Sequence, residues 1–298
     1  MTRDGLLLVD KPEGPSSAEI VSRVKAALGA KKIGHLGTLD PFASGLLPLG
    51  INEGTKIAGL FLGARKSYAG SIALGIETDS QDSTGRVIRT ADAPPLDDRD
   101  LDVLREKFSG TLWQTPPMFS ALKKSGERLY RLARRGEVVE RAPRQVEIEQ
   151  LRLWQAGPGE IRFELTCSKG TYMRALAADI GSFLGCGAHL KSLRRLSCGH
   201  LTLAQAAPLD FIESAKDQAK LPILSLDQAL SHLGSIGLSE AQAAQVRRGQ
   251  QELLRPFEPP PEGETLARLI DQRGEVVAIV QWAQPTGWRL MRVFPEQS

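Results

Sequence analysis

Residues 34–48 read Gly34-His35-Leu36-Gly37-Thr38-Leu39-Asp40-Pro41-Phe42-Ala43-Ser44-Gly45-Leu46-Leu47-Pro48 and govern the interpretation of the whole chain. Four glycines and two prolines between positions 34 and 50 predict an ordered loop rather than a helix or a strand. The loop presents one histidine, His35, and one carboxylate, Asp40, among apolar side chains. A partly desolvated carboxylate is a candidate nucleophile. The alternative is that Asp40, which precedes a proline, only forms a side-chain turn with nearby N–H groups.

The segments outside this loop predict a mixture of helices and strands. Hydrophobic periodicity favours helices over residues 17–28, 98–108 and 173–184, and a capping box at Ser16–Glu19 marks the start of the first. Alternating or short apolar runs predict strands at 68–74, 146–153, 161–167, 276–282 and 288–293. Because strands and helices do not alternate regularly, we expect an α+β fold with a central antiparallel or mixed sheet flanked by helices.

The length of 298 residues, 41% of them hydrophobic, suits one large or two ordinary domains. Short strands dominate after about residue 230, so we expect a main domain over 1–232 and a small β-rich domain over 233–298. No apolar run near the start is long enough for a membrane span or a signal peptide. Three cysteines without a C-x-x-C pair fit a reducing compartment. Together these features predict a soluble, cytoplasmic protein.

The formal net charge is only +3, but the charges are unevenly distributed. Residues 76–106 carry nine acids against four arginines. Residues 119–145 carry three acids against eight bases: Lys123, Lys124, Arg128, Arg131, Arg134, Arg135, Arg141 and Arg144. This basic segment, and a second cluster formed by Lys191, Arg194 and Arg195, could contact phosphates. The alternative is an ordinary solvated surface.

Two other patterns contain the residue types of a metal site and of a phosphate-binding loop, but their spacing does not match either kind of site. Cys186, His189, Cys198 and His200 are metal-ligand types within fifteen residues, but the thiols are split and the spacing does not suit structural zinc. The glycines of 34–50 lack the G-x-x-x-x-G-K-[ST] pattern of a phosphate-binding loop. We therefore expect neither a metal site nor nucleotide hydrolysis.

Four ordered motifs together resemble the TruB family of pseudouridine synthases. The segment 34–48 is similar to the signature loop of that family, although Leu36 stands where threonine is expected. The other motifs are Asp10-Lys11-Pro12 with Gly14 and Ser16-Ser17, then Gln114 to Lys123 with Gly126 and Tyr130, then Cys167 to Arg174. The resemblance runs from about residue 5 to 230, and the tail is similar to a PUA-like RNA-binding domain.

The resemblance implies a reaction and a substrate. Members of the family convert uridine to pseudouridine, in bacteria at position 55 in the T arm of tRNA, by breaking the N1–C1′ bond and rejoining the base through C5. This isomerisation implies no redox cofactor and no metal. The resemblance places the attacking carboxylate at Asp40. It leaves open whether the carboxylate oxygen attacks C6 of the base or C1′ of the sugar. We expect a monomer that acts on tRNA without a guide RNA.

The resemblance also assigns roles to five further residues. Arg174 is expected to pair with Asp40 through a bidentate guanidinium and to lower its pKa, and Tyr68 to stack on the target base. Tyr172 and Leu193 are expected to line the same pocket. His35 is expected to pack against the RNA where the target nucleotide has been flipped out. From the residues alone, Tyr68 and Leu193 could equally be core residues, and Arg174 a surface residue.

Two alternatives belong to other classes. The chain could be a noncatalytic RNA-binding or RNA-folding module. It could also be a guide-RNA-dependent pseudouridylase that requires partner proteins, although no long basic tail is present.

Overall fold

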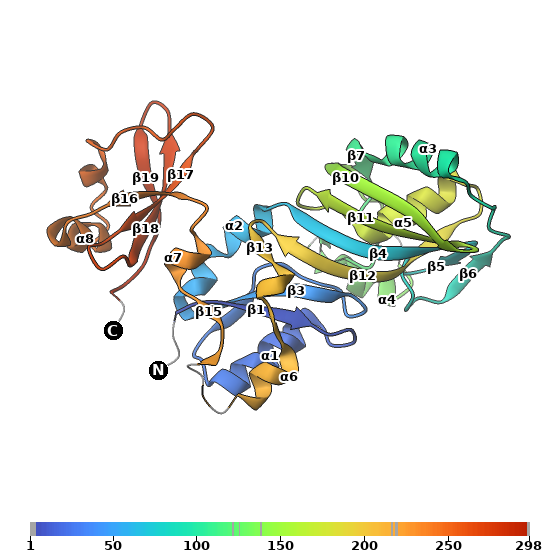
Figure 1. The fold of residues 1–298 in the computed structure, drawn as a ribbon, viewed down its shortest axis with the longest axis horizontal. Helices are drawn as coiled ribbons and strands as arrows, with labels where there is room; N and C mark the ends of the chain where they lie inside the picture. The colour runs from blue at the N-terminus through green and yellow to red at the C-terminus, as the bar shows by residue number, and fades with distance from the viewer. Residues whose placement is uncertain are drawn as a thin grey trace.

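The computed structural model describes residues 4–296 except 121, 125, 138, 216, 218 and 219, and omits the side chains of 123, 124, 128, 130 and 134. Its main feature is an eleven-stranded mixed sheet (Figure 1). Strands β1 and β14 are parallel, as are β3 and β12, whereas the other pairings in this sheet are antiparallel. In sheet order the strands are β14 (Ala207–Pro208), β1 (Gly5–Lys11), β3 (Ser44–Ile51), β12 (Ala188–Cys198), β4 (Lys66–Leu74), β11 (Glu160–Cys167), β10 (Arg144–Gly157) and β7 (Gly110–Gln114), with β13 (Leu201–Thr202) on β12, β15 (Ile223–Leu224) on β1 and β2 (Ile33–His35) on β3.

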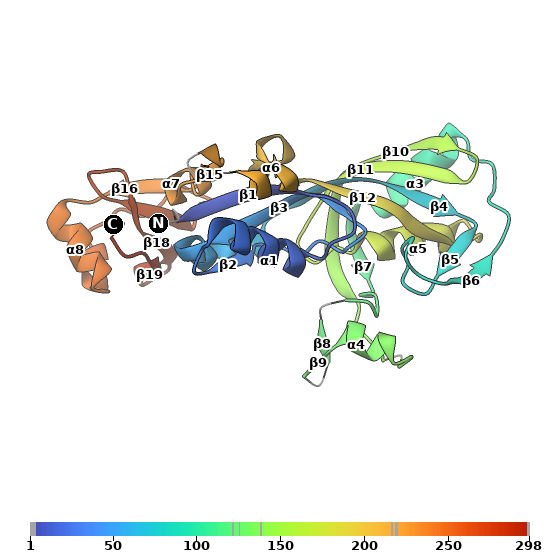
Figure 2. The ribbon, with the colours of Figure 1, turned by 90° about the horizontal axis from the view of Figure 1, so that it is seen from below.

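Helices cover this sheet at both ends. The pair α1 (Ser17–Leu28) and α6 (Leu209–Ser214) lies beside β1, whereas α3 (Asp98–Phe108) packs on β10 near one end of the sheet and α5 (Met173–Phe183) packs on β12 and contacts α3 (Figures 1 and 2). The expected capping box at Ser16 and Glu19 is present, and Gly29 ends α1 in the left-handed conformation. The apolar faces of these helices and the sheet form one continuous core.

A smaller unit projects from the main sheet. The two-stranded sheet of β8 (Lys123–Lys124) and β9 (Glu127–Arg128), followed by α4 (Leu129–Arg134), extends away from the body of the molecule (Figure 2). A second short hairpin, β5 (Ile76–Thr78) with β6 (Val87–Thr90), precedes α3.

The C-terminal part forms a separate four-stranded sheet. Its strands are β16 (Gly234–Gly237), β17 (Leu266–Ile270), β18 (Val276–Ala283) and β19 (Gly287–Val293), accompanied by α8 (Glu240–Arg247). Val276, Ile279 and Phe294 pack into a buried cluster with Leu6 and Phe61 of the first part. A β-rich C-terminal unit is thus confirmed, whereas the division at 232/233 stays a prediction because the two parts share a core.

The predicted helices at 17–28, 98–108 and 173–184 and the predicted strands are confirmed, to within a few residues at their ends. The expectation of a loop over 34–50 is confirmed for residues 36–43, which include Asp40, and is wrong for 34–35 and 44–50, which belong to β2 and β3. Every residue of β3 is buried. One side of the strand pairs with β1, and the other side, which Pro48 O faces, pairs with β12 as far as Gly45 and with β2 from Leu49 onward. Pro48 lies between these two stretches, and the missing proline N–H therefore removes no ladder hydrogen bond there.

Candidate active site

Asp40 lies in the tight connection between β2 and β3. The hydroxyl of Ser17, at the start of α1, accepts a hydrogen bond from Leu39 N and donates one to Leu39 O, both at 2.8 Å. The connection closes on itself through Ala43 N, which donates to Asp40 O at 3.1 Å. The Asp40 side chain keeps 38% of its surface exposed, so a rigid backbone holds an accessible carboxylate.

A buried lysine fixes the residues that flank Asp40. Lys11, at the end of β1, has no exposed surface. Its Nζ donates to the carbonyls of Pro12 (2.9 Å), Pro41 (3.1 Å) and Ala43 (2.6 Å). Burial lowers the pKa of Lys11 to about 8, and the negative charge of Asp40 opposes that shift. The N-terminal motif thus contributes an anchor for the Asp40 connection.

Arg195 holds the other side of the connection. Its guanidinium donates to Leu46 O (2.7 Å), Gly37 O (3.1 Å) and Thr38 O (3.3 Å). The side chain is almost completely buried, and the prediction that Arg195 contacts phosphates is wrong. A guanidinium can be buried here because backbone carbonyls satisfy its donors.

Arg174, in the first turn of α5, reaches Asp40. Its Nη2 lies 3.0 Å from Asp40 Oδ2, and its Nη1 lies 3.6 Å from Asp82 Oδ2. The two guanidinium nitrogens therefore contact different carboxylates, and the expected bidentate pairing with Asp40 alone is wrong. Nη2 also donates to Phe119 O at 2.7 Å and Nη1 to Ser80 O at 3.3 Å. Only 7% of the Arg174 side chain is exposed, so the surface alternative is wrong as well.

Asp82 is a site residue that sequence reasoning missed, because it falls in the acid-rich segment 76–106. It is buried, and its Oδ1 accepts from the Ser80 hydroxyl at 2.7 Å and from Thr84 N at 3.0 Å. The hydroxyl-rich run around Asp82, Asp79-Ser80-Gln81-Asp82-Ser83-Thr84, was the available signal for a carboxylate with local donors. Three charged groups thus meet at this point, with Arg174 between Asp40 and Asp82.

The pKa of Asp40 is raised above its ordinary value. Desolvation is the main cause, and the negative charge of Asp82 adds to it. Arg174 acts in the expected direction and lowers the pKa, as does the more weakly coupled Lys11, but burial outweighs both. The carboxylate therefore combines a strong cationic partner with incomplete solvation, as an activated nucleophile requires.

Tyr172 and Tyr68 lie on different elements, and Tyr68 is buried in the main core. Tyr172 immediately precedes α5, and burial raises the pKa of its phenol, which the charges of both Arg174 and Asp40 also influence. Tyr68 lies on β4 beside Arg195 of β12. Burial raises the pKa of Tyr68 to about 12, against the positive charge of Arg195. Both phenols are therefore neutral near pH 7.

Leu193 and His35 are the remaining predicted site residues. Leu193, on β12, is buried in the main core opposite Gly70 of β4. His35, at the end of β2, is half-buried, and desolvation followed by the charge of Arg195 lowers its pKa. Its Nδ1 is buried without a hydrogen-bond partner among the described residues. The roles of both residues stay predictions.

The lysines and arginines predicted to contact RNA differ in exposure and in ion pairing. Arg131 and Arg144 are exposed, Arg141 is half-buried, and Arg135 pairs with Glu127 and Glu137. The side chains of Lys123, Lys124, Arg128 and Arg134 lie outside the described residues. In the second cluster, Lys191 pairs with Glu160 and Arg194 with Asp10. Contact with phosphates stays a prediction for all except Arg195.

The sequence offers four side chains of metal-ligand type between residues 186 and 200. Of these, Cys186 and Cys198 are buried, His189 Nδ1 lies 2.9 Å from Ile76 O, and the His200 ring lies against that of His232 with 4.2 Å between ring centroids. In the described part of the chain, no three His, Cys, Asp or Glu residues are grouped as metal ligands. Nor does any helix there have the length and apolar character needed to cross a membrane.

Comparison with known proteins agrees with this geometry. A model of the TruB family pseudouridylate synthase N-terminal domain matches residues 25–173, and a model of the tRNA pseudouridylate synthase B C-terminal domain matches 174–236. The two models meet inside α5, whereas the main sheet continues to β15, so they do not test the domain division predicted at 232/233.

The relatives span most of the chain. The tRNA pseudouridine synthase B of Geobacter sulfurreducens is 41% identical over 98% of this chain and 99% of its own length. That of Burkholderia mallei is 44% identical over 83% of this chain and 82% of its own. Among solved structures, a Cbf5–Nop10–Gar1 complex contains a chain with the same fold, with a TM-score of 0.74 at 24% identity over 98% of this chain and 85% of that one. By its family models and its relatives, the chain belongs to the TruB family of pseudouridylate synthases.

Proposed function

We propose that this chain isomerises uridine 55 in the T arm of tRNA to pseudouridine, with Asp40 as the nucleophile. The observation that carries the proposal is the 3.0 Å contact between Arg174 Nη2 and the half-exposed Asp40 carboxylate. The relatives named tRNA pseudouridine synthase B, which match 94–98% of this chain, support tRNA as the substrate.

The proposed reaction moves one bond within the nucleotide. The N1–C1′ bond breaks, a C5–C1′ bond forms, the proton on C5 leaves to solvent, and N1 gains a proton. Asp40 forms the transient covalent bond, at either C6 or C1′, and is released when the new glycosidic bond is complete. Arg174 orients Asp40 and opposes the effect of burial on its pKa, because its fixed N–H groups favour the carboxylate over the protonated acid.

The target uridine must leave its base stack to reach Asp40, because a base stacked inside the folded T arm does not expose its ring atoms to a side chain on the enzyme surface. In this proposal Tyr68 stacks on the extruded uracil, and Tyr172 and Leu193 line the pocket around it. His35, whose lowered pKa keeps it neutral, packs into the space that the base leaves behind. A neutral imidazole costs little to desolvate against stacked bases.

We further propose that the chain works alone, as a cytoplasmic monomer on bare tRNA, with a main domain over 1–232 and a PUA-like RNA-binding domain over 233–298. The identities of 41–44% to relatives named as tRNA enzymes favour this over a guide-RNA-dependent assembly, since the Cbf5 structures share the fold at only 22–24% identity. Exposed bases such as Arg131 and Arg144 contact phosphates, so affinity for tRNA falls as salt is added.

The test is release of tritium from [5-³H]uridine in an unmodified tRNA transcript. The wild-type chain should release tritium, and Asp40→Asn should release none. Asp92→Asn makes the same chemical change at an exposed position and should match wild type. Asp40→Ala should keep tRNA binding within roughly tenfold, because phosphate contacts dominate the affinity.

A mass-shift assay after chemical derivatisation of pseudouridine then locates the product, which is expected at position 55. Equal release by wild type and Asp40→Asn, or none from either, supports the noncatalytic RNA-binding alternative. Release that requires added guide RNA and partner proteins contradicts the standalone enzyme.

A further inference from the structure

A glutamine side chain holds the residue at which α5 begins. Gln114, the last residue of the edge strand β7, is only 2% exposed. Its Oε1 accepts a hydrogen bond from Tyr172 N at 3.0 Å, and its Nε2 donates to Tyr172 O at 3.4 Å. One planar amide therefore pairs with both backbone groups of Tyr172, as a neighbouring strand would.

The backbone N–H of Tyr172 depends on this amide, because α5 does not supply another hydrogen-bond acceptor for it. Tyr172 is the N-cap of α5, and no side chain caps that end. Tyr172 O also accepts from Leu176 N at 3.1 Å, whereas in the described part of the chain the hydrogen-bond partner of Tyr172 N is Gln114. Removing the amide would leave a partly buried donor unpaired, and the backbone at Tyr172 would lose the two contacts that hold it against β7.

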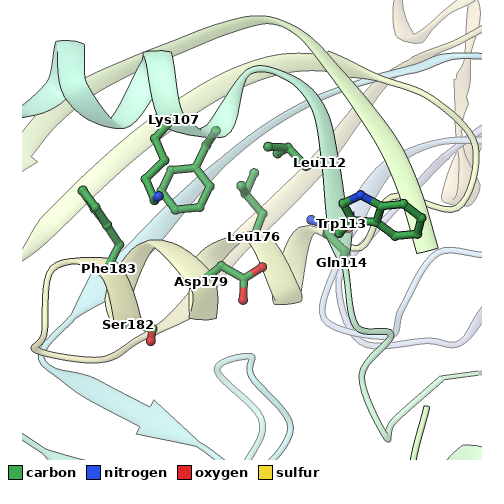
Figure 3. Close-up of a pocket in the computed structure, with 9 residues that line it drawn as sticks. Lys107, Leu112, Trp113, Gln114, Leu176, Asp179, Ser182 and Phe183 are labelled. Carbon is green, nitrogen blue, oxygen red and sulfur yellow. The ribbon is translucent and has the colours of Figure 1, made fainter. Parts of the chain in front are cut away.

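Gln114 borders open space on one side. A cavity of about 380 Å³ lies beside it, between α3, β7 and α5 (Figure 3). Its walls include Lys107, Trp113, Leu176 and Phe183. Because this space could admit a displaced side chain, the two hydrogen bonds to Tyr172 keep Gln114 in place.

The anchored segment carries the site. Tyr172 is two residues before Arg174, and the charges of Arg174 and Asp40 both act on the Tyr172 phenol. A shift of the backbone at Tyr172 would therefore move the phenol and the first turn of α5, from which the guanidinium reaches Asp40.

We propose that Gln114 is a positioning residue for the reaction, which fixes Tyr172 and the start of α5 relative to Asp40. This inference rests on the proposed function. Gln114 touches no reacting atom in this role, and acts through the backbone of Tyr172.

The first test compares Gln114→Met, which keeps the size but loses both hydrogen bonds, with Gln155→Met, the same change at an exposed position of β10. Gln114→Met should lower the single-turnover rate of tritium release at least about tenfold while the Kd for tRNA stays within about threefold. Gln155→Met should match wild type in both. A Gln114→Met rate within twofold of wild type overturns the proposal.

The second test uses Gln114→Glu and pH. A protonated glutamic acid can accept from Tyr172 N and donate to Tyr172 O, whereas the ionised form loses the donor and repels Tyr172 O. The rate of Gln114→Glu relative to wild type should therefore rise as the pH is lowered from 8.5 to 6. A ratio that does not change with pH contradicts the proposed pairing.

The third test does not depend on activity. The chain has three tyrosines, so tyrosine labelled with ¹³C at Cζ gives a spectrum of three assignable signals. Gln114→Met should shift or broaden the Tyr172 signal and leave Tyr68 unchanged, and Gln155→Met should alter neither. An unchanged Tyr172 signal sinks the positioning role even if the wild-type chain releases no tritium, an outcome that would separately refute the proposed function.

Discussion

At the scale of single residues, the shape of the Arg174 guanidinium matters as much as its charge. It contacts the carboxylates of Asp40 and Asp82 and the carbonyls of Ser80 and Phe119. The compact ammonium of a lysine cannot span these four groups. We expect Arg174→Lys to lower the single-turnover rate by roughly two orders of magnitude, the cost of a small misplacement of reacting groups. Arg152→Lys, on the exposed side of β10, should have no effect, and near-normal rates in both would remove the pairing role.

Asp82 opposes the ionisation of Asp40 while it anchors Arg174. Its negative charge raises the pKa of Asp40, so Asp82→Asn should lower that pKa. Since the ionised carboxylate is the reactive form, the acidic limb of the pH–rate profile should move to lower pH. The maximal rate should still fall, because Arg174 Nη1 loses its carboxylate partner. A limb that stays in place or moves to higher pH would contradict this account of the three charges.

At the scale of elements, the contact between β3 and β12 depends on a residue without a side chain. Gly45 has φ of +99°, and a Cβ there would lie 2.4 Å from Arg195 O and 2.7 Å from Arg195 N. Gly45→Ala should therefore reduce the free energy of unfolding by roughly 2–4 kcal/mol, measured by urea denaturation. Gly59→Ala is the matched control, because a Cβ at this position of α2 (Ala58–Gly63) meets open space. It should be neutral or stabilising by up to about 1 kcal/mol.

The link between β1 and the Asp40 connection should respond to pH through Lys11. Its folded pKa of about 8 lies below the unfolded value of 10.5, so the unfolded chain binds more protons between these values. Stability from this group must then rise with pH, by about 1.5 kcal/mol between pH 8 and 9.5. Lys11→Met should be less stable throughout and lack this rise, as urea midpoints at each pH would show. Parallel pH profiles in the two chains would rule out the shift.

Elements with strong local signals were predictable, and those governed by tertiary contacts were not. The helix 17–28 carries a capping box and a left-handed glycine at its end, so its bounds follow from its own residues. The central strand β12 escaped prediction because Lys191, Arg194 and Arg195 suggested a surface. Only the fold shows that carbonyls of the Asp40 connection, from another part of the chain, satisfy the buried Arg195.

The same reasoning applies to the site. Family motifs contained Asp40 and Arg174, and the structure brings them together. The motifs also contained Lys11 and Gln114, but their roles depend on which backbone groups lie opposite them, and spacing along the chain cannot reveal that. Asp82 lies outside the four family motifs, and only its contact with Arg174 in the structure identifies it as part of the site.

At the scale of the whole molecule, the two sheets share a hydrophobic cluster. Ile279 of the second sheet is fully buried in it together with Leu6, Leu8 and Phe61 of the first part. Neither sheet can unfold alone without exposing this apolar surface, so we expect one cooperative transition. The four tryptophans permit a direct test, because Trp113 and Trp154 lie in the main sheet whereas Trp282 and Trp288 lie in the second.

In a Trp113→Phe/Trp154→Phe chain, tryptophan fluorescence reports only on the second sheet, while far-ultraviolet circular dichroism follows the whole fold. Their urea midpoints should agree within about 0.2 M. Adding Ile279→Ala removes buried methylene and methyl groups at the shared cluster and should cost about 3 kcal/mol. Because the cluster belongs to both sheets, both midpoints should fall together. As the control, Val103→Ala, at an exposed site on α3, should move neither urea midpoint. A fall in the fluorescence midpoint alone on Ile279→Ala would mean that the C-terminal sheet unfolds as an independent domain.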